Sequence, residues 1–187
     1  MNIYTYYNDI ALLKLKTSAD DDILQQQVIL RAMETVESAE CFIYGYGSLQ
    51  LNGISSEKLY YGRVDLISLQ ECERIMGRVW APSDNTGQFC ALGRNGIDAC
   101  NGNENIKRLI HKIKKTYFFF NINYFCLYCF FFGFIGDSGS GLVCKNSSGD
   151  LELWGITSYG MGCEGSAGVY QNVEYHRTWI ENTMTKF

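Results

Sequence analysis

The chain has 187 residues, of which 47% are hydrophobic, and it carries a formal net charge of −4 at pH 7. This length and apolar share fit one globular domain with a sizeable core. Because the acidic balance provides no basic surface for contacting phosphates, we predict no nucleic-acid partner.

Glycine and cysteine indicate the structural class and the compartment. Nineteen glycines against one proline, with many short runs of Val, Ile, Leu and Tyr, favour a turn-rich β protein over a helical bundle. Eight cysteines suggest disulfides and an oxidising compartment. Asn146-Ser147-Ser148 is an N-glycosylation sequon, which is consistent with secretion but common by chance. Residues 1–9 lack a signal-peptide pattern, so the protein is either cytosolic or its beginning is missing, and the cysteines favour the second.

The predicted elements of the first half are strands and one helix. Asp9–Leu15 predicts a strand that starts at an acidic residue, and Cys41–Gly47 predicts a second strand that ends in Gly-Tyr-Gly. Apolar residues at near-helical spacing over Leu66–Met76 predict a short helix, with Ser68 as its N-cap and Gly77 as its stop. Loops are expected after this helix.

The second half is predicted to be loops and strands that end in a helix. Gln88–Gly102 is rich in Gly and Asn and predicts a loop, and Gly136–Gly141 predicts a tight turn. Leu151–Tyr159 and Gly168–Val173 predict strands, and Glu174–Met184 predicts a closing amphipathic helix.

One motif indicates chemistry. Gly136-Asp137-Ser138-Gly139-Ser140-Gly141 places a serine in a glycine-dense turn, where small neighbours let a substrate carbonyl approach and backbone N–H groups converge on one oxygen. The alternative is an ordinary turn in which Ser138 is merely exposed.

Four blocks, taken in order, resemble the chymotrypsin/trypsin family of serine proteases. They cover nearly all of the chain except 103–135, and their conjunction is far more specific than any one of them. The blocks are Asn8–Leu15, Phe89–Ala91 with Asp98–Gly102, Gly136–Cys144, and Trp154–Gly160 with Gly168–Tyr170.

The resemblance implies an all-β, trypsin-like double β-barrel fold. The chain would supply mainly the C-terminal antiparallel barrel with a C-terminal helix, and the first barrel would be largely missing, so 1–187 is expected to be a partial trypsin-like serine protease domain. The implied function is serine endopeptidase cleavage after Arg or Lys. No cofactor is implied, and no metal site is predicted because the C-x-x-C of Cys126 and Cys129 has no second pair or His at zinc spacing.

The same resemblance assigns the catalytic roles. Ser138 would be the nucleophile and Asp9 the carboxylate that orients a histidine, while Gly102 or Gly136 with Ser138 would form the oxyanion hole. Asp137 would pair with a newly cut N-terminus during zymogen activation. For Asp9, the alternative is a surface aspartate at a strand end.

Substrate contacts are implied for five residues. Asp98 would lie at the base of the primary pocket and favour Arg or Lys, because a carboxylate in a narrow pocket is costly unless a cation pairs with it. The alternative for Asp98 is a solvated loop acid. Gly160 and Gly168 would leave the pocket open, and Ser158 and Tyr159 would line the cleft.

Disulfides are implied by the family pattern for six of the eight cysteines. The expected pairs are Cys41–Cys144, Cys72–Cys90 and Cys100–Cys163. The two cysteines left over, Cys126 and Cys129, both lie within 103–135, which suggests that this segment does not belong to the disulfide framework.

The histidine base is not found where the family pattern needs it. Only eight residues precede Asp9, and the two histidines present are His111 and His176, neither of which fits the role. We therefore expect the chain as written to be an inefficient enzyme. The alternatives are a non-catalytic, protease-like binding protein, or a protein tethered to a membrane through 116–134.

Residues 103–135 are anomalous in composition. Phe, Tyr, Asn, Ile and Lys make up 24 of the 33 residues, and Val, Ala, Ser, Pro and Asp are absent. As a membrane span, 116–134 would contain the costly Asn121 and Asn123 and would place Asp98 and Ser138 on opposite faces of a bilayer. A translated intron explains the composition better, since its A- and T-rich codons would give these residues and excision from Gly102 to Gly136 restores the family spacing.

The resemblance and the cysteines together predict an extracellular protein. Its expected partners are polypeptide substrates or protease inhibitors. No nucleic-acid or membrane partner is expected.

Overall fold

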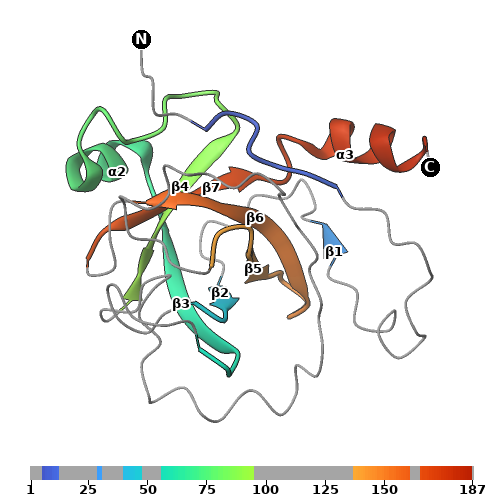
Figure 1. Cartoon of the computed structure of the whole chain (residues 1–187), viewed down its shortest axis with the longest axis horizontal. Coiled ribbons are helices and arrows are strands. Elements are labelled where there is room, and N and C mark those ends of the chain that lie inside the picture. Colours follow the sequence, from blue (N-terminus) through green and yellow to red (C-terminus); the bar gives the residue numbers. More distant parts are fainter. Residues whose placement is uncertain are drawn as a thin grey trace.

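The computed structural model describes residues 6–12, 29–30, 40–47, 56–94, 137–160 and 165–186. Within these ranges the chain forms seven strands and two helices (Figure 1). Their bounds are β1 Ile29–Leu30, β2 Cys41–Gly45, β3 Tyr60–Ile67, α2 Leu69–Met76, β4 Gln88–Gly93, β5 Gly141–Lys145, β6 Leu151–Gly160, β7 Ala167–Asn172 and α3 Arg177–Met184.

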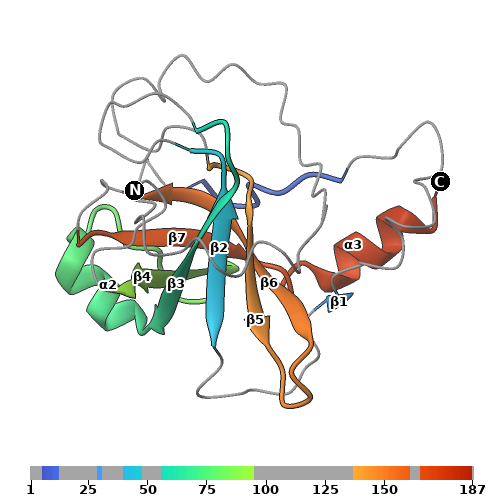
Figure 2. The same cartoon turned by 90° about the horizontal axis from the view of Figure 1, so that it is seen from below.

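Six of these strands close into an antiparallel barrel. The sheet order is β1-β6-β5-β2-β3-β4-β7, and an additional pairing of β6 with β7 joins the two sides. Closure leaves the six strands without a free edge, so no unpaired backbone groups of these strands are open to pairing with another chain. The short β1 lies outside the ring and pairs with β6 in parallel. The all-β barrel expected from the resemblance is therefore present, with α2 and α3 at opposite sides of it (Figures 1 and 2).

Alternating strand residues fill the barrel interior. In β2 the side chains of Cys41 and Ile43 are buried while their neighbour Phe42 is only partly buried, as the two-residue repeat of a strand requires. The interior cluster consists of Cys41, Ile43, Val64, Ala91, Leu142, Cys144, Trp154 and Tyr170. A second cluster packs α2 against the barrel, and a third contains Ile180 of α3 together with the partly buried Ile10 and Leu12.

Two disulfides lie within the described residues. Cys41–Cys144 joins directly opposed positions of β2 and β5. Cys72–Cys90 ties α2 to β4. They are two of the three pairs expected from the family pattern, and the third, Cys100–Cys163, lies outside the described residues.

The predicted helix around Cys72 is present with tighter bounds. Ser68 is its N-cap, and the Ser68 Oγ accepts a 3.1 Å hydrogen bond from the Glu71 N–H. Gly77 ends the helix at φ 81°, a left-handed conformation that glycine adopts at low cost. Leu66 and Ile67 belong instead to β3, so the helix starts three residues later than the apolar spacing suggested.

Three local predictions need correction. Gln88–Gly93 is strand β4 and not loop, because its pairing with β3 and β7 overrides the glycine signal at its end. Tyr60–Ile67 forms β3, a strand that the sequence did not predict. Asp9–Leu12, the described part of the predicted first strand, makes no strand pairing, and its side chains Ile10 and Leu12 pack against the barrel instead.

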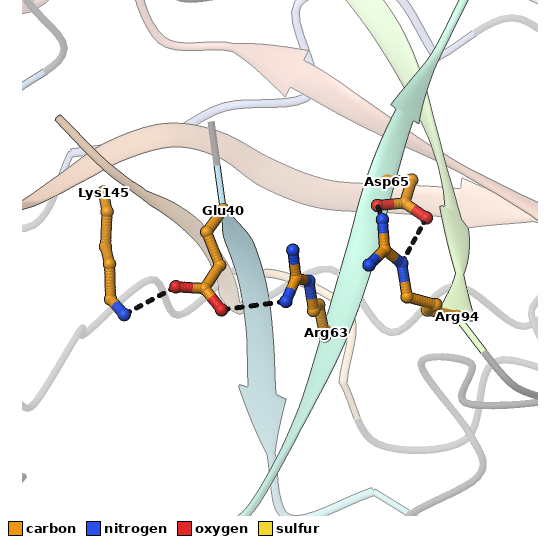
Figure 3. A network of polar contacts seen from close by, with 5 residues as sticks. All are labelled: Glu40, Arg63, Asp65, Arg94 and Lys145. Carbon is orange, nitrogen blue, oxygen red and sulfur yellow. Dashed lines mark hydrogen bonds and ion pairs between the residues drawn. The ribbon is translucent and has the colours of Figure 1, made fainter. Parts of the chain in front are cut away.

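Charged side chains cross the outside of the barrel (Figure 3). Glu40 accepts from Lys145 Nζ at 2.6 Å and from Arg63 at 3.0 Å, and Asp65 pairs with Arg94 at 2.7 Å through two hydrogen bonds. The hydrogen bond from Lys145 lowers the pKa of the Glu40 carboxyl. These partly exposed pairs each stabilise the fold only slightly, but together they favour the β5-β2-β3-β4 register.

Across the described ranges, no helix is both long enough and apolar enough to traverse a bilayer.

Candidate active site

Ser138 lies at the exposed tip of a tight turn that precedes β5. The Ser140 N–H donates to the Asp137 carbonyl at 3.0 Å and closes the turn. Gly139, the third residue of the turn, has φ 82°, a conformation that a type II turn requires at this position and that glycine supplies without strain. Ser138 itself is exposed, so its hydroxyl is accessible to a ligand.

Strand β6 holds this turn in place through Thr157. The Gly139 N–H donates to the Thr157 carbonyl at 2.9 Å, and the Thr157 N–H donates to the Ser140 carbonyl at 2.8 Å. The hydroxyls of Ser140 and Thr157 lie 3.1 Å apart and share a hydrogen bond. Three hydrogen bonds from one buried residue therefore fix the backbone on the C-terminal side of Ser138.

The Asp137 carboxyl is partly buried against the end of β2. Its Oδ1 accepts a 2.7 Å hydrogen bond from the Gly47 N–H, and burial raises the pKa of Asp137 to about 6, although the Gly47 hydrogen bond opposes this rise. Gly45 and Gly47 give the carboxyl its space, because a Cβ at either position would overlap the Asp137 carboxyl. The Gly-Tyr-Gly sequence at the end of β2 is thus explained by close contact with Asp137.

Asp9 is held by Ser158, the residue that follows Thr157 in β6. The Ser158 Oγ donates a 2.7 Å hydrogen bond to Asp9 Oδ2. Asn8, just before Asp9, has φ 58°, and the Ile10 N–H donates to the Asn8 carbonyl at 2.8 Å, so the chain turns tightly at this point. Asp9 is only partly buried, and this hydrogen bond holds its carboxyl beside β6.

A β-bulge aims Ser158 at Asp9. Thr157 pairs with Tyr170 of β7 and Tyr159 pairs with Val169, so Ser158 has no partner in β7. The extra residue of a bulge redirects its side chain relative to the regular alternation of the strand. As a result, the consecutive residues Thr157 and Ser158 serve different parts of the site, one holding the Ser138 turn and the other holding Asp9.

Two glutamines hold the segment that carries Asp9. Gln88 of β4 and Gln171 of β7 each donate from Nε2 to the Tyr6 carbonyl at 2.8 Å. Gln171, which is fully buried, also donates to Ser158 Oγ at 3.3 Å. The segment is therefore attached to three strands of the barrel, although it is not itself a strand.

Tyr159, Gly160 and Gly168 lie together at the end of β6. Gly160 and Gly168 are directly opposed across β6 and β7, so this pair contributes no side-chain bulk. The Tyr159 ring lies 5.5 Å from the Tyr6 ring, and its hydroxyl donates to the Trp80 carbonyl at 3.1 Å. Burial raises the pKa of Tyr159 to about 12, so its hydroxyl stays protonated and remains a donor.

Several predicted site residues lie outside the described residues. These are Asp98, Gly102, Gly136, Cys100 and Cys163. Their roles remain predictions.

His176 is the one histidine among the described residues, and it is the buried N-cap of α3. Burial lowers the pKa of its imidazole, and its ring packs edge-on against Tyr175. Within the described part of the chain, no hydrogen bond links His176 to Asp9 or Ser138.

The described residues include no group of three His, Cys, Asp or Glu side chains that is suited to hold a metal ion.

Sequence reasoning missed the residues that support the site. Thr157, Gln88 and Gln171 are buried polar residues in otherwise apolar strands. A polar residue inside a buried strand needs a hydrogen-bond partner, and that requirement is the signal that could have drawn attention to them.

A closed antiparallel barrel with a C-terminal helix and a serine in its glycine turn is the architecture of a trypsin-like protease barrel, and the comparisons agree. The trypsin family model matches residues 1–104 and 128–180. Trypsin eta of Drosophila melanogaster is 27% identical over 100% of this chain and 57% of its own length, and trypsin II-P29 of Gallus gallus is 27% identical over 98% and 58%. Serine protease 56 of Mus musculus is 27% identical over 97% of this chain and 25% of its own length.

The solved structure of neuropsin, a serine protease expressed in the limbic system of mouse brain, is also similar. It has a TM-score of 0.53 and 25% sequence identity, covering 84% of this chain and 53% of neuropsin. This chain belongs to the trypsin family of serine proteases. It spans about half the length of neuropsin and of the two trypsins, and a quarter of serine protease 56.

Proposed function

We propose that the barrel carries part of a serine endopeptidase site in which Ser138 is the nucleophile and Asp9 orients a histidine base. One arrangement supports this proposal: Thr157 holds the Ser138 turn, while its neighbour Ser158 donates to Asp9 at 2.7 Å. Two of the groups that the proposed mechanism needs, the nucleophile and the orienting carboxylate, are thus attached to consecutive residues of one strand. Polypeptides are the substrate class of the family and the proposed substrates here.

In the proposed mechanism the serine hydroxyl attacks the scissile carbonyl while a histidine takes its proton. Asp9, fixed by Ser158, would hold that histidine in one orientation and stabilise its charged form. Backbone N–H groups of Ser138 and of Gly102 or Gly136 would bind the oxyanion. The fixed turn around Gly139 supports this role, because an oxyanion site works only if its donors are positioned before the reaction.

We assign Arg and Lys specificity to Asp98. The directly opposed Gly160 and Gly168 support an open pocket wall, and Tyr159 would line the adjoining cleft. Binding of an aromatic amidine, a planar cation, tests this part without requiring turnover. The Asp98→Asn variant should lose at least tenfold in amidine affinity, whereas Asp84→Asn, an exposed acid, should not change it. If Asp98→Asn binds the amidine as tightly as the parent chain does, the assignment is contradicted.

We further propose that the 187-residue chain alone is a poor catalyst. Its sequence contains two histidines, and the one in the described part is buried at the start of α3 without a hydrogen bond to Ser138 or Asp9. A serine without a base is a weak nucleophile at neutral pH, and only the residual rate of the oxyanion site, on the order of 10³ to 10⁴ over water, would be left.

A fluorophosphonate, which labels activated serines, tests whether Ser138 is an active nucleophile in this chain. We expect negligible labelling of the 187-residue chain. Labelling that is lost in Ser138→Ala but kept in Ser140→Ala would contradict the inactivity while supporting Ser138 as the nucleophile.

The second candidate function is a non-catalytic protein that binds a polypeptide or a protease inhibitor through the same cleft. The observation that favours it is that His176, the histidine among the described residues, makes no hydrogen bond to Ser138 or Asp9. Retention of amidine or inhibitor binding with no serine labelling would support it.

We also propose an extracellular location, which the two disulfides and the family membership support.

A further inference from the structure

The turn between β5 and β6 is organised around the side chain of Asn146. Its Oδ1 accepts hydrogen bonds from the Ser148 N–H at 3.0 Å and from the Asp150 N–H at 2.8 Å. The backbone of Asn146 closes the same turn, accepting from the Gly149 N–H at 3.0 Å and donating to the Asp150 carbonyl at 2.9 Å. The side chain is therefore held in one orientation. The turn that joins β5 to β6 forms the free end of this hairpin (Figure 2).

Asn146 is also the first residue of Asn146-Ser147-Ser148, the only N-x-Ser/Thr sequence of the chain. We propose that Asn146 is an N-glycosylation site that carries an oligosaccharide when the chain enters the secretory pathway. The inference rests on the proposed extracellular location and not on catalysis. Local geometry supports it: in this Asx turn the Ser148 N–H contacts the amide oxygen, which brings the hydroxyl-bearing residue beside the amide that would be modified.

The turn has room for a bulky group. Ser147, Ser148, Gly149 and Asp150 are all exposed. A Cβ added at Gly149 would meet no atom within 4 Å. A sugar linked to this turn would therefore extend into solvent without displacing the barrel.

The amide nitrogen itself keeps a proton available. Asn146 Nδ2 donates one hydrogen bond, at 3.2 Å, to Oε1 of the buried Glu152. An amide nitrogen carries two protons, and within the described residues the second makes no hydrogen bond. Substitution of that proton by a sugar still leaves one N–H in the folded protein.

The reaction is a glycosyl transfer from a polyprenyl-diphosphate-linked oligosaccharide. The bond from Nδ2 to the anomeric carbon forms, the bond from that carbon to the diphosphate oxygen breaks, and Nδ2 loses one proton. The polyprenyl diphosphate is the leaving group, so no oxidant or reductant is needed.

The glycan would not cover the proposed catalytic turn. The Ser138 turn precedes β5 and Asn146 follows it, so the two lie at opposite ends of a five-residue strand, a separation of roughly 16 Å. The modification should therefore protect the hairpin end of the barrel while it leaves Ser138 accessible.

Translation of the full chain behind a secretion leader, in the presence of microsomes, tests the inference. We expect one upward gel shift that an N-glycan-releasing amidase reverses, with conversion of Asn146 to aspartate seen by peptide mass spectrometry. This readout is independent of Ser138, so it distinguishes failure of this inference from failure of the proposed protease site.

Two neighbouring exposed serines provide a matched pair of variants. Ser148→Ala removes the hydroxyl but keeps Asn146 and the backbone N–H that binds its side chain, so it should lose the shift completely. Ser147→Ala is the same chemical change one residue earlier and should keep the shift, and Ser148→Thr should keep it as well. Absence of a shift in the parent chain, or a shift that survives in Ser148→Ala, would overturn the inference.

Discussion

The Ser158 hydroxyl donates a 2.7 Å hydrogen bond to the Asp9 carboxyl, although 149 positions separate the two residues in the sequence. The contact exists because a bulge in β6 releases Ser158 from the regular pairing with β7. It connects the N-terminal segment to the strand that also holds the Ser138 turn.

Ser158→Ala should lower the free energy of unfolding by about 1.5 kcal/mol, because the hydrogen bond to the Asp9 carboxyl group is lost. Asp9→Asn should cost less in the Ser158→Ala background than in the parent chain. Urea unfolding of both single variants and of the double variant measures this coupling. Strictly additive effects would show that the contact contributes nothing to stability.

The Asp137 carboxyl should make stability depend on pH. Its pKa is about 6 in the folded protein against an ordinary 3.8, so between about pH 4 and about pH 6 the folded state binds more protons than the unfolded state. The free energy of unfolding should therefore fall as the pH rises through this window, by up to about 3 kcal/mol. Asp137→Asn should flatten this dependence and keep the oxygen that accepts from Gly47.

Asp84→Asn is the control for this measurement, because Asp84 is exposed. Urea midpoints of the parent chain and both variants across the window give the comparison. The same slope in the parent chain and in Asp137→Asn would mean that another group causes the pH dependence.

Loss of the two disulfides should destabilise the barrel to different degrees. Cys41–Cys144 spans 103 positions and Cys72–Cys90 spans 18. On chain entropy alone, removal of the first should cost about 4 to 5 kcal/mol and removal of the second about 3 kcal/mol. Paired Cys→Ala variants compared by urea unfolding test this order. A reversed order would indicate that packing around α2 outweighs loop length.

Gln171→Met should loosen the segment around Tyr6. The change keeps the volume but removes the donors to the Tyr6 carbonyl and to Ser158 Oγ, for an expected loss of about 1 to 2 kcal/mol. Gln88→Met is the matched variant, since Gln88 donates to the same carbonyl but does not contact Ser158. Limited proteolysis should cleave near Tyr6 sooner in Gln171→Met than in Gln88→Met, and equal rates would contradict the role given to Gln171.

The hypothesis that 103–135 is a translated intron is tested at the level of RNA. Amplification of transcripts across the codons for Cys100 and Asp137 should give a product that lacks the interval. If every product contains the interval, the segment belongs to the protein and the hypothesis fails.

The sequence was most informative where the local structure depends on a few neighbouring residues. Ser68 and Gly77 delimited α2 closely, because a helix cap depends on neighbours only a few residues away. The alternating and apolar runs of β6 and β7 were also recognised. In contrast, β3 and β4 were missed, because their glycines and polar residues give a weak local signal that pairing with neighbouring strands overcomes.

The sequence by itself determined the family, the serine in its glycine turn and the cysteines available for pairing, since each of these is written in residues close together or in their order. Only the tertiary structure decided which strand holds the turn, that Ser158 reaches Asp9, and that Gln88 and Gln171 secure the Tyr6 segment. These contacts join residues 17 to 165 positions apart. No local pattern encodes them, because closure of the barrel is what brings the distant donors and acceptors together.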